Sequence, residues 1–143
     1  MKSSVDSEAA VGEKMVDAPW LDALKKALIS TGLDSEDLYA LLEASIVTEK
    51  INFPAFIYDA SHGFGFTVSE GFSYSLDQNW DDPESFNEVS FFLGEMETSS
   101  ISVSDYVSLM KIAADIYSAF FPDEGNGVLR SAERLEERYS RRL

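Results

Sequence analysis

The spacing of the hydrophobic residues changes twice along this chain of 143 residues. Before residue 50 they recur every three or four positions, which is typical of amphipathic helices. From Ile51 to Val103 they alternate with small or polar residues, which is the period of half-buried strands. After Ser104 the three-four spacing returns. The order predicts an α+β domain with an N-terminal αα-hairpin, an antiparallel sheet of about four strands and two C-terminal helices.

A single domain is expected to account for residues 17–143. Residues 1–16 are small and polar without a hydrophobic period, which predicts a flexible tail. Hydrophobic residues make up 45% of the sequence, which is enough for one core. We find neither a secretory signal nor an apolar run that could span a membrane, so we expect a soluble cytoplasmic protein.

Turn and capping residues mark the ends of the two N-terminal helices. Pro19 is tolerated in a first helical turn, and Gly32 is a natural stop. Asp34 is expected to cap the second helix, with Leu33 packing on Leu38 as a hydrophobic staple. The residues expected to be buried are Leu21, Leu24, Leu28, Leu38, Leu41, Leu42 and Ile46.

The alternating region predicts four strands and an acid-rich loop. The strands are expected at Phe64–Val68, Phe72–Leu76, Glu88–Leu93 and, as a short strand, Ile101–Val103. The connections are expected to be a turn at Ser69–Gly71, the loop at Asp77–Asn87 and a turn at Gly94–Ser100.

Two helices are expected to complete the domain. Ser102 or Ser104 can cap the first of them, and Pro122 can end it. A turn is expected at Asp123–Gly127, followed by a last helix. Its buried side is expected to carry Val128, Ala132, Leu135 and Tyr139, and its exposed side a Glu137–Arg141 ion pair.

The charge of the chain excludes several classes of partner. The sequence has 26 acidic and 11 basic residues, a net charge of −15. Residues 51–129 contain 13 acids and a single base, Lys111, whereas residues 130–143 contain five arginines and three glutamates. A surface this negative repels phosphate groups, so we expect neither a nucleic acid nor an anionic membrane as a partner.

Residues that could support catalysis or bind a metal are scarce. The chain has no cysteine and one histidine, His62. We expect His62 on a strand, where the adjacent Ser61 would point to the opposite face and could not be its partner. The glycines of Gly63–Phe66 lack the spacing of a nucleotide-binding loop. A calcium loop counted from Asp77 lacks the glycine required at its sixth position. We therefore expect no enzymatic activity, no cofactor and no metal.

The acid-rich loop is the best candidate for a binding site. Eleven aromatic residues lie between Phe53 and Phe92, interleaved with acids. Trp80 has no apolar neighbour at strand or helix spacing, so it either anchors a protein–protein interface or fills a gap in the core. The expected partner-binding residues are Asp77, Trp80, Asp81, Asp82, Glu84 and Glu88. Complementary charge predicts a basic protein as the partner, and nucleases are basic because their clefts attract phosphate groups.

Four segments carry a family resemblance. They are the glycine-aromatic run Gly63–Phe66, the strand Glu88–Leu93, the strand and helix start Ser100–Tyr106, and the helix end Phe121–Asp123. Together they resemble the CdiI-type immunity proteins, which neutralise ribonuclease toxins in bacterial contact-dependent growth inhibition. The resemblance covers about half of the chain, from Gly63 to Tyr139.

The resemblance implies a cytoplasmic antitoxin without catalytic activity. Such a protein would bind the C-terminal domain of its cognate toxin as a monomer, in a 1:1 complex, and block the nuclease active site. It implies no particular site residues, because each immunity protein is matched to its own toxin. The alternative is an acidic homodimeric type III secretion chaperone that binds an effector segment, with the helix at residues 104–121 as its dimer interface.

Overall fold

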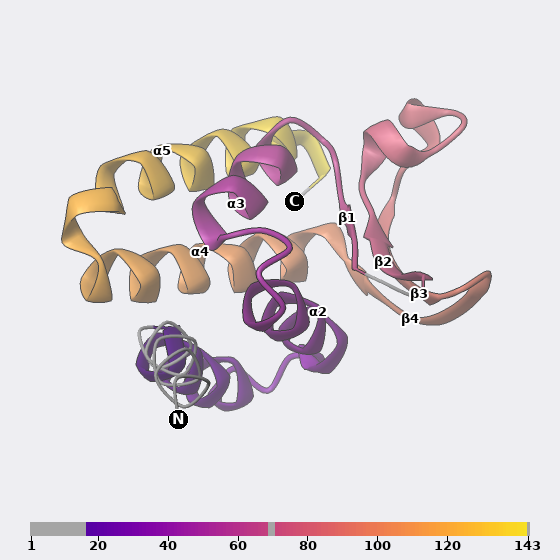
Figure 1. Cartoon of the computed structure of the whole chain (residues 1–143). Helices are drawn as coiled ribbons and strands as arrows, with labels where there is room; N and C mark the ends of the chain where they lie inside the picture. Colours follow the sequence, from indigo (N-terminus) through magenta and orange to yellow (C-terminus); the bar gives the residue numbers. More distant parts are fainter. Residues whose placement is uncertain (1–16, 69–70, 143) are drawn as a thin grey trace, which may run out of the picture.

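The computed structural model describes residues 17–68 and 71–142 of the chain, which form an α+β structure (Figure 1). The α+β class and the antiparallel four-stranded sheet agree with the prediction from hydrophobic spacing, and the helices lie to one side of the sheet (Figure 1). The predicted tail at residues 1–16 and part of the predicted turn at Ser69–Gly71 lie outside the described residues. None of the helices in the described ranges combines the length and the hydrophobicity that a membrane span requires.

The N-terminal αα-hairpin is confirmed. Residues 17–30 are helical, Gly32 adopts a φ of 76°, and α2 (Glu36–Val47) follows. The predicted capping residue was wrong, because α2 begins after Ser35 rather than Asp34, and the Ser35 side chain makes no capping hydrogen bond. All seven residues predicted for the buried stripes are buried.

The helix α3 (Phe53–Ser61) corrects the prediction of alternating structure from Ile51. The Asn52 side chain caps this helix by accepting a hydrogen bond from the Ala55 amide, with an N–O distance of 2.9 Å. Pro54 lies in its first turn, where a missing N–H costs nothing. The apolar face of the helix has helical spacing and is fully buried; it consists of Phe53, Phe56, Ile57 and Ala60.

The sheet has the strand order β1 (Phe66–Thr67), β2 (Phe72–Ser75), β3 (Glu88–Leu93) and β4 (Met96–Ser102). The bounds of β3 agree with the prediction, whereas β1 is shorter. The predicted turn at Gly94–Ser100 was wrong, because β3 and β4 form a tight hairpin in which Leu93 pairs with Met96. The sequence of β4 lacks the hydrophobic alternation that is typical of a strand. Most of this strand is exposed, and only Ser99, Ser100 and Ile101 are partly or fully buried.

The C-terminal helices α4 (Val103–Phe120) and α5 (Pro122–Arg138) run side by side (Figure 1). Ser102 caps α4 by accepting a hydrogen bond from the Asp105 amide, with an N–O distance of 3.0 Å. The predicted turn at Asp123–Gly127 was wrong: Pro122 begins α5, and both glycines are helical. A Cβ at Gly125 would lie 2.9 Å from the Cβ of Ser118, so this glycine permits the close approach of the two helices.

The last helix buries the side that the sequence predicts. Val128, Ala132, Leu135 and Tyr139 are all buried. The predicted Glu137–Arg141 ion pair does not form within the described part of the chain, where the ion pairs are Lys26–Asp22, Lys111–Glu136 and Arg138–Asp77.

Candidate functional site

The loop between β2 and β3, residues 77–87, is called the acidic loop below. It begins with η2 (Asp77–Asn79) and includes η3 (Pro83–Ser85), which are short 3-10 turns. Asp77 fastens its first turn to the C-terminal end of α5. The Arg138 Nε and Nη2 atoms donate to Oδ1 and Oδ2 of Asp77 over 3.1 and 2.7 Å, and the Tyr139 hydroxyl donates to Oδ1 over 2.6 Å. The carboxylate is thus bound on both oxygens.

These hydrogen bonds keep Asp77 ionised although it is buried. Burial alone would raise its pKa, but the donors Arg138, Tyr139 and Gln78 outweigh burial and lower the pKa to about 2. In the same cluster, burial and then the hydrogen bond to Asp77 raise the pKa of Tyr139. Asp77 is only 7% exposed, so the structure gives this predicted partner-binding residue an internal role.

Gly63 completes the cluster that fastens the loop. It adopts a φ of 89°, and its carbonyl accepts a hydrogen bond from the Gln78 amide over 2.9 Å. A Cβ at this position would lie 2.5 Å from Nη2 of Arg138 and 2.7 Å from Oδ1 of Asp77. The positive φ and the crowded Cβ position together favour glycine at residue 63, which is a structural reason for the first glycine of the run at Gly63–Phe66.

The environment of Trp80 is compatible with both roles that its sequence context suggests, packing on the core and anchoring an interface. Its ring is half-buried and meets Phe86 edge to face, with the ring centroids 5.5 Å apart. Phe86 is fully buried and packs on Tyr139. Trp80 therefore packs against the edge of the core and keeps part of its ring accessible to a partner.

The other acids of the loop face solvent. Asp81, Asp82 and Glu84 are exposed, and Glu88 is half-buried at the start of β3. Asp82 also shapes the loop, since its Oδ1 accepts from the Glu84 amide over 3.2 Å and its Oδ2 from the Ser85 hydroxyl over 2.8 Å. None of these four carboxylates forms an ion pair with a described basic residue. The structure thus brings Trp80 and four unpaired acids together on one loop and the adjoining strand end.

His62 lies at the end of α3, which corrects the strand predicted for it. Its Nδ1 atom is 2.9 Å from the Tyr58 carbonyl oxygen and 3.2 Å from the Ser61 hydroxyl oxygen. Ser61 donates its own proton to the Tyr58 carbonyl over 2.6 Å, and the His62 ring packs on that of Tyr58. Both side chains are thus engaged with the helix end. Within the described residues, no three acidic or histidine side chains converge as metal ligands would.

The face of the sheet that points away from the helices is partly accessible, although Ser90 on it is buried, and the sequence did not reveal this face. The helices pack on the face that carries the buried Tyr74, Val89 and Phe91 (Figure 1). The opposite face, called the outer face below, carries the alternate residues of each strand. They are Thr67, Ser73, Ser75, Glu88, Ser90, Phe92, Glu97, Ser100 and Ser102.

No protein-family model matches this chain, and no curated protein or solved structure matches it with significance.

Proposed function

We propose that this protein is an immunity protein that binds a basic nuclease toxin domain and blocks its active site. The acidic loop would contact the nuclease cleft, with its exposed carboxylates in the positions of substrate phosphates. The complex would form 1:1 in the cytoplasm, without a cofactor and without catalysis by this chain.

The proposal is supported by a fixed loop whose carboxylates are exposed to solvent. Asp81, Asp82 and Glu84 are exposed and form no ion pair with a described basic residue, yet Asp77 and Trp80 fasten their loop to α5 and Phe86. A loop already held in place loses little conformational entropy on binding, so more of the contact energy appears as affinity. The negative field of residues 51–129 also speeds encounter with a basic partner.

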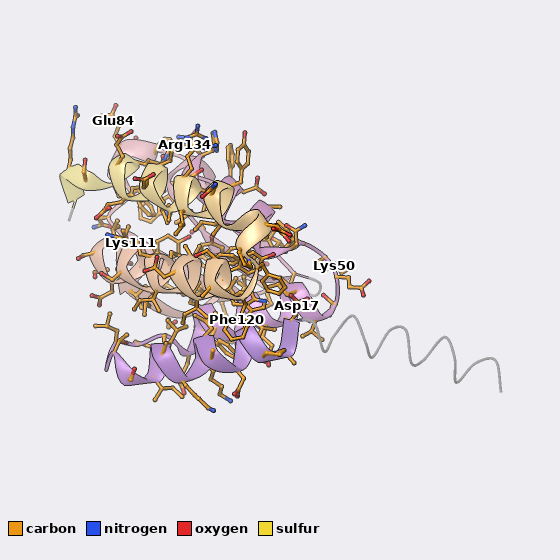
Figure 2. The ribbon with its side chains drawn as sticks, turned by 90° about the vertical axis from the view of Figure 1, so that its left-hand side faces the viewer. Asp17, Lys50, Glu84, Lys111, Phe120 and Arg134 are labelled. Atoms are coloured by element: carbon orange, nitrogen blue, oxygen red, sulfur yellow. The ribbon has the colours of Figure 1, made fainter. Side chains whose placement is uncertain are left out.

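The environment of α4 favours this function over the homodimeric chaperone. A chaperone would need an apolar helix free for dimerisation. Eight residues of α4 are buried within the monomer, among them Tyr106, Leu109 and Met110. Figure 2 views the helical side, where Lys111 of α4 lies beside α5; it forms an ion pair with Glu136 over 3.0 Å. The apolar face of α4 is thus occupied inside one chain.

The test uses the toxin domain that the proposal requires. Genes for toxin and immunity protein are expected side by side, so the basic C-terminal domain of a large secreted protein encoded upstream is the partner to express. Co-expression of this chain should abolish growth arrest by that domain, and sedimentation should give a 1:1 complex. Persistent growth arrest, or the absence of a complex, would contradict the proposal.

A charge-matched pair of variants tests the site. Asp81→Asn combined with Asp82→Asn removes two charges, and asparagine retains the capping geometry of η3. We expect a loss of affinity of about tenfold or more. The control, Asp115→Asn with Asp123→Asn, removes two exposed charges from α4 and from the opposite end of α5 and should retain the affinity.

Salt and catalysis give two further checks. Association should slow as ionic strength rises while dissociation changes less, because screening acts mainly on long-range steering.

His62→Ala should still protect cells, because the proposed mechanism is occlusion. Loss of protection in this variant, with the complex intact, would indicate catalysis instead.

A further inference from the structure

The outer face of the sheet carries mostly small side chains and one aromatic residue. The strand register places the residues of this face in rows across the sheet. One row contains Thr67, Ser73, Phe92 and Glu97, and the next contains Ser75, Ser90 and Ser100. Serine and threonine make up half of the first row and all of the second, and Phe92 is the only aromatic residue in either row. Small side chains let another protein surface approach the strands closely.

Phe92 and Glu97 are a cross-strand pair on this face. They are direct register partners on β3 and β4, and the Cβ atoms of such pairs lie roughly 5 Å apart. Phe92 is half-buried and lines a hollow of about 320 Å³ that is also bordered by Thr67, Ser73 and Ser75. Glu97 is exposed and forms no ion pair with a described residue.

An aromatic face beside a free carboxylate fits a guanidinium group. Arginine stacks its planar group on an aromatic ring and at the same time donates hydrogen bonds to a carboxylate. Lysine carries the same charge but offers no planar group for stacking. The charge of the outer face is complementary, since it carries Glu88 and Glu97 and no basic residue.

We propose that the Phe92–Glu97 pair is a receptor for an arginine side chain of the partner, and that the outer face docks on a basic protein surface. The arginine stacks on Phe92, ion-pairs with Glu97 and covers the hollow beside β1 and β2. This inference extends the proposed interface from the acidic loop to the sheet, and it rests on the proposed function only for the identity of the partner.

The test compares two synthetic peptides that differ in one residue type. An arginine–glycine heptapeptide and the matching lysine–glycine heptapeptide are titrated into the ¹⁵N-labelled full chain. We expect the arginine peptide to bind about two- to fivefold more tightly, because only the guanidinium stacks flat on the ring while it donates to the carboxylate. The largest amide shifts should map to residues 92 and 97 and to their neighbours on β2.

Two substitutions separate stacking from charge. Phe92→Leu keeps an apolar side chain but removes the aromatic face, so it should abolish the preference for arginine over lysine. Phe120→Leu, at an exposed phenylalanine at the end of α4, is the control that should retain the preference. Glu97→Gln should weaken binding of both peptides, whereas Glu95→Gln in the adjacent turn should weaken it less. The amide spectrum of each variant verifies that it is folded.

The outcomes distinguish this inference from the proposed function. Equal affinity for the two peptides, shifts confined to the acidic loop, or no binding at all would overturn the arginine receptor, even if a toxin domain binds. Arginine preference that maps to Phe92 and Glu97 would support the receptor, even if no nuclease toxin is bound. In that second case the proposed immunity function would be contradicted, whereas the proposed docking surface on the outer face would be supported.

Discussion

Asp77 and the pair Asp81–Asp82 lie within five residues of one another, yet their environments are opposite. Asp77 is buried and accepts hydrogen bonds from Arg138 and Tyr139, which lie about 60 residues away in the sequence. Asp81 and Asp82 are exposed and have no basic partner among the described residues. Asp77 therefore fastens the loop to α5, whereas Asp81 and Asp82 remain accessible to a partner. Residue type and sequence proximity do not distinguish these roles, whereas the position of α5 does.

The largest effect is expected from removing the buried carboxylate. Asp77→Ala leaves the Arg138 guanidinium and the Tyr139 hydroxyl without their acceptor, which should lower the free energy of unfolding by about 2–4 kcal/mol. Urea denaturation measures this loss. Asp81→Ala is the matched control, for which we expect a change of about 0.5 kcal/mol or less. Equal losses in the two variants would remove the distinction between the carboxylates.

Packing around the same cluster is tested at Gly63. Gly63→Ala combines an unfavourable φ with a Cβ that clashes with Arg138 and Asp77, so we expect a loss of about 2 kcal/mol or more. Gly32 has a similar positive φ of 76° but open space around its Cβ position. Gly32→Ala should cost only about 1 kcal/mol, and the difference between the two variants measures the packing. Equal losses of unfolding free energy in the two variants would show that the side chains of Arg138 and Asp77 move aside at little cost.

The environment of Asp77 also predicts that the free energy of unfolding decreases as the pH falls. The pKa of Asp77 is about 2 in the folded protein and 3.8 as a reference for the unfolded chain. Between these values the unfolded state binds more protons, so the stabilisation by Asp77 is complete above about pH 4 and is lost as the pH falls towards 2. Asp77→Asn should lack this component. The difference between wild-type and variant unfolding free energies, followed from pH 5 to pH 2, isolates it; a difference that does not shrink would contradict the prediction.

A smaller effect is expected from one hydroxyl. Tyr139→Phe removes the donor to Oδ1 of Asp77 and leaves the two Arg138 hydrogen bonds in place. We expect a loss of about 1 kcal/mol in unfolding free energy. A double-mutant cycle with Asp77→Ala should show that most of this loss disappears once the carboxylate is absent. Additive losses would mean that the hydroxyl contributes independently of Asp77.

Local patterns predicted most of the fold. Helical stripes placed the αα-hairpin and both C-terminal helices, and β3 was predicted with its bounds. The missed helix α3 was signalled by Asn52 and Pro54, a cap and a first-turn proline, but the nearby alternation of Phe64 and Phe66 was extended too far towards the N-terminus. The helical start of α5 was missed because Gly125 and Gly127 favour a turn locally, whereas close packing on Ser118 favours glycine inside the helix.

The candidate site was predictable only in part. Composition and loop residues identified the acidic loop and Trp80, because acids without apolar neighbours seldom lie in a core. The internal role of Asp77 depends on Arg138, and no local pattern links two residues so distant in sequence. Likewise, the pairing of Phe92 with Glu97 depends on a register shift between Phe91 and Phe92, which sequence spacing does not reveal.

The most direct test measures affinity and stability together in two variants, Asp77→Asn and the pair Asp81→Asn with Asp82→Asn. The measurements are the dissociation constant for the upstream-encoded basic toxin domain and the free energy of unfolding of the unbound chain. We predict that Asp77→Asn lowers stability and weakens binding only modestly, because the loop is then held less firmly, whereas the loop pair retains stability and loses about tenfold or more in affinity. Unchanged affinity in the loop pair, with the loss appearing in Asp77→Asn instead, would contradict the account.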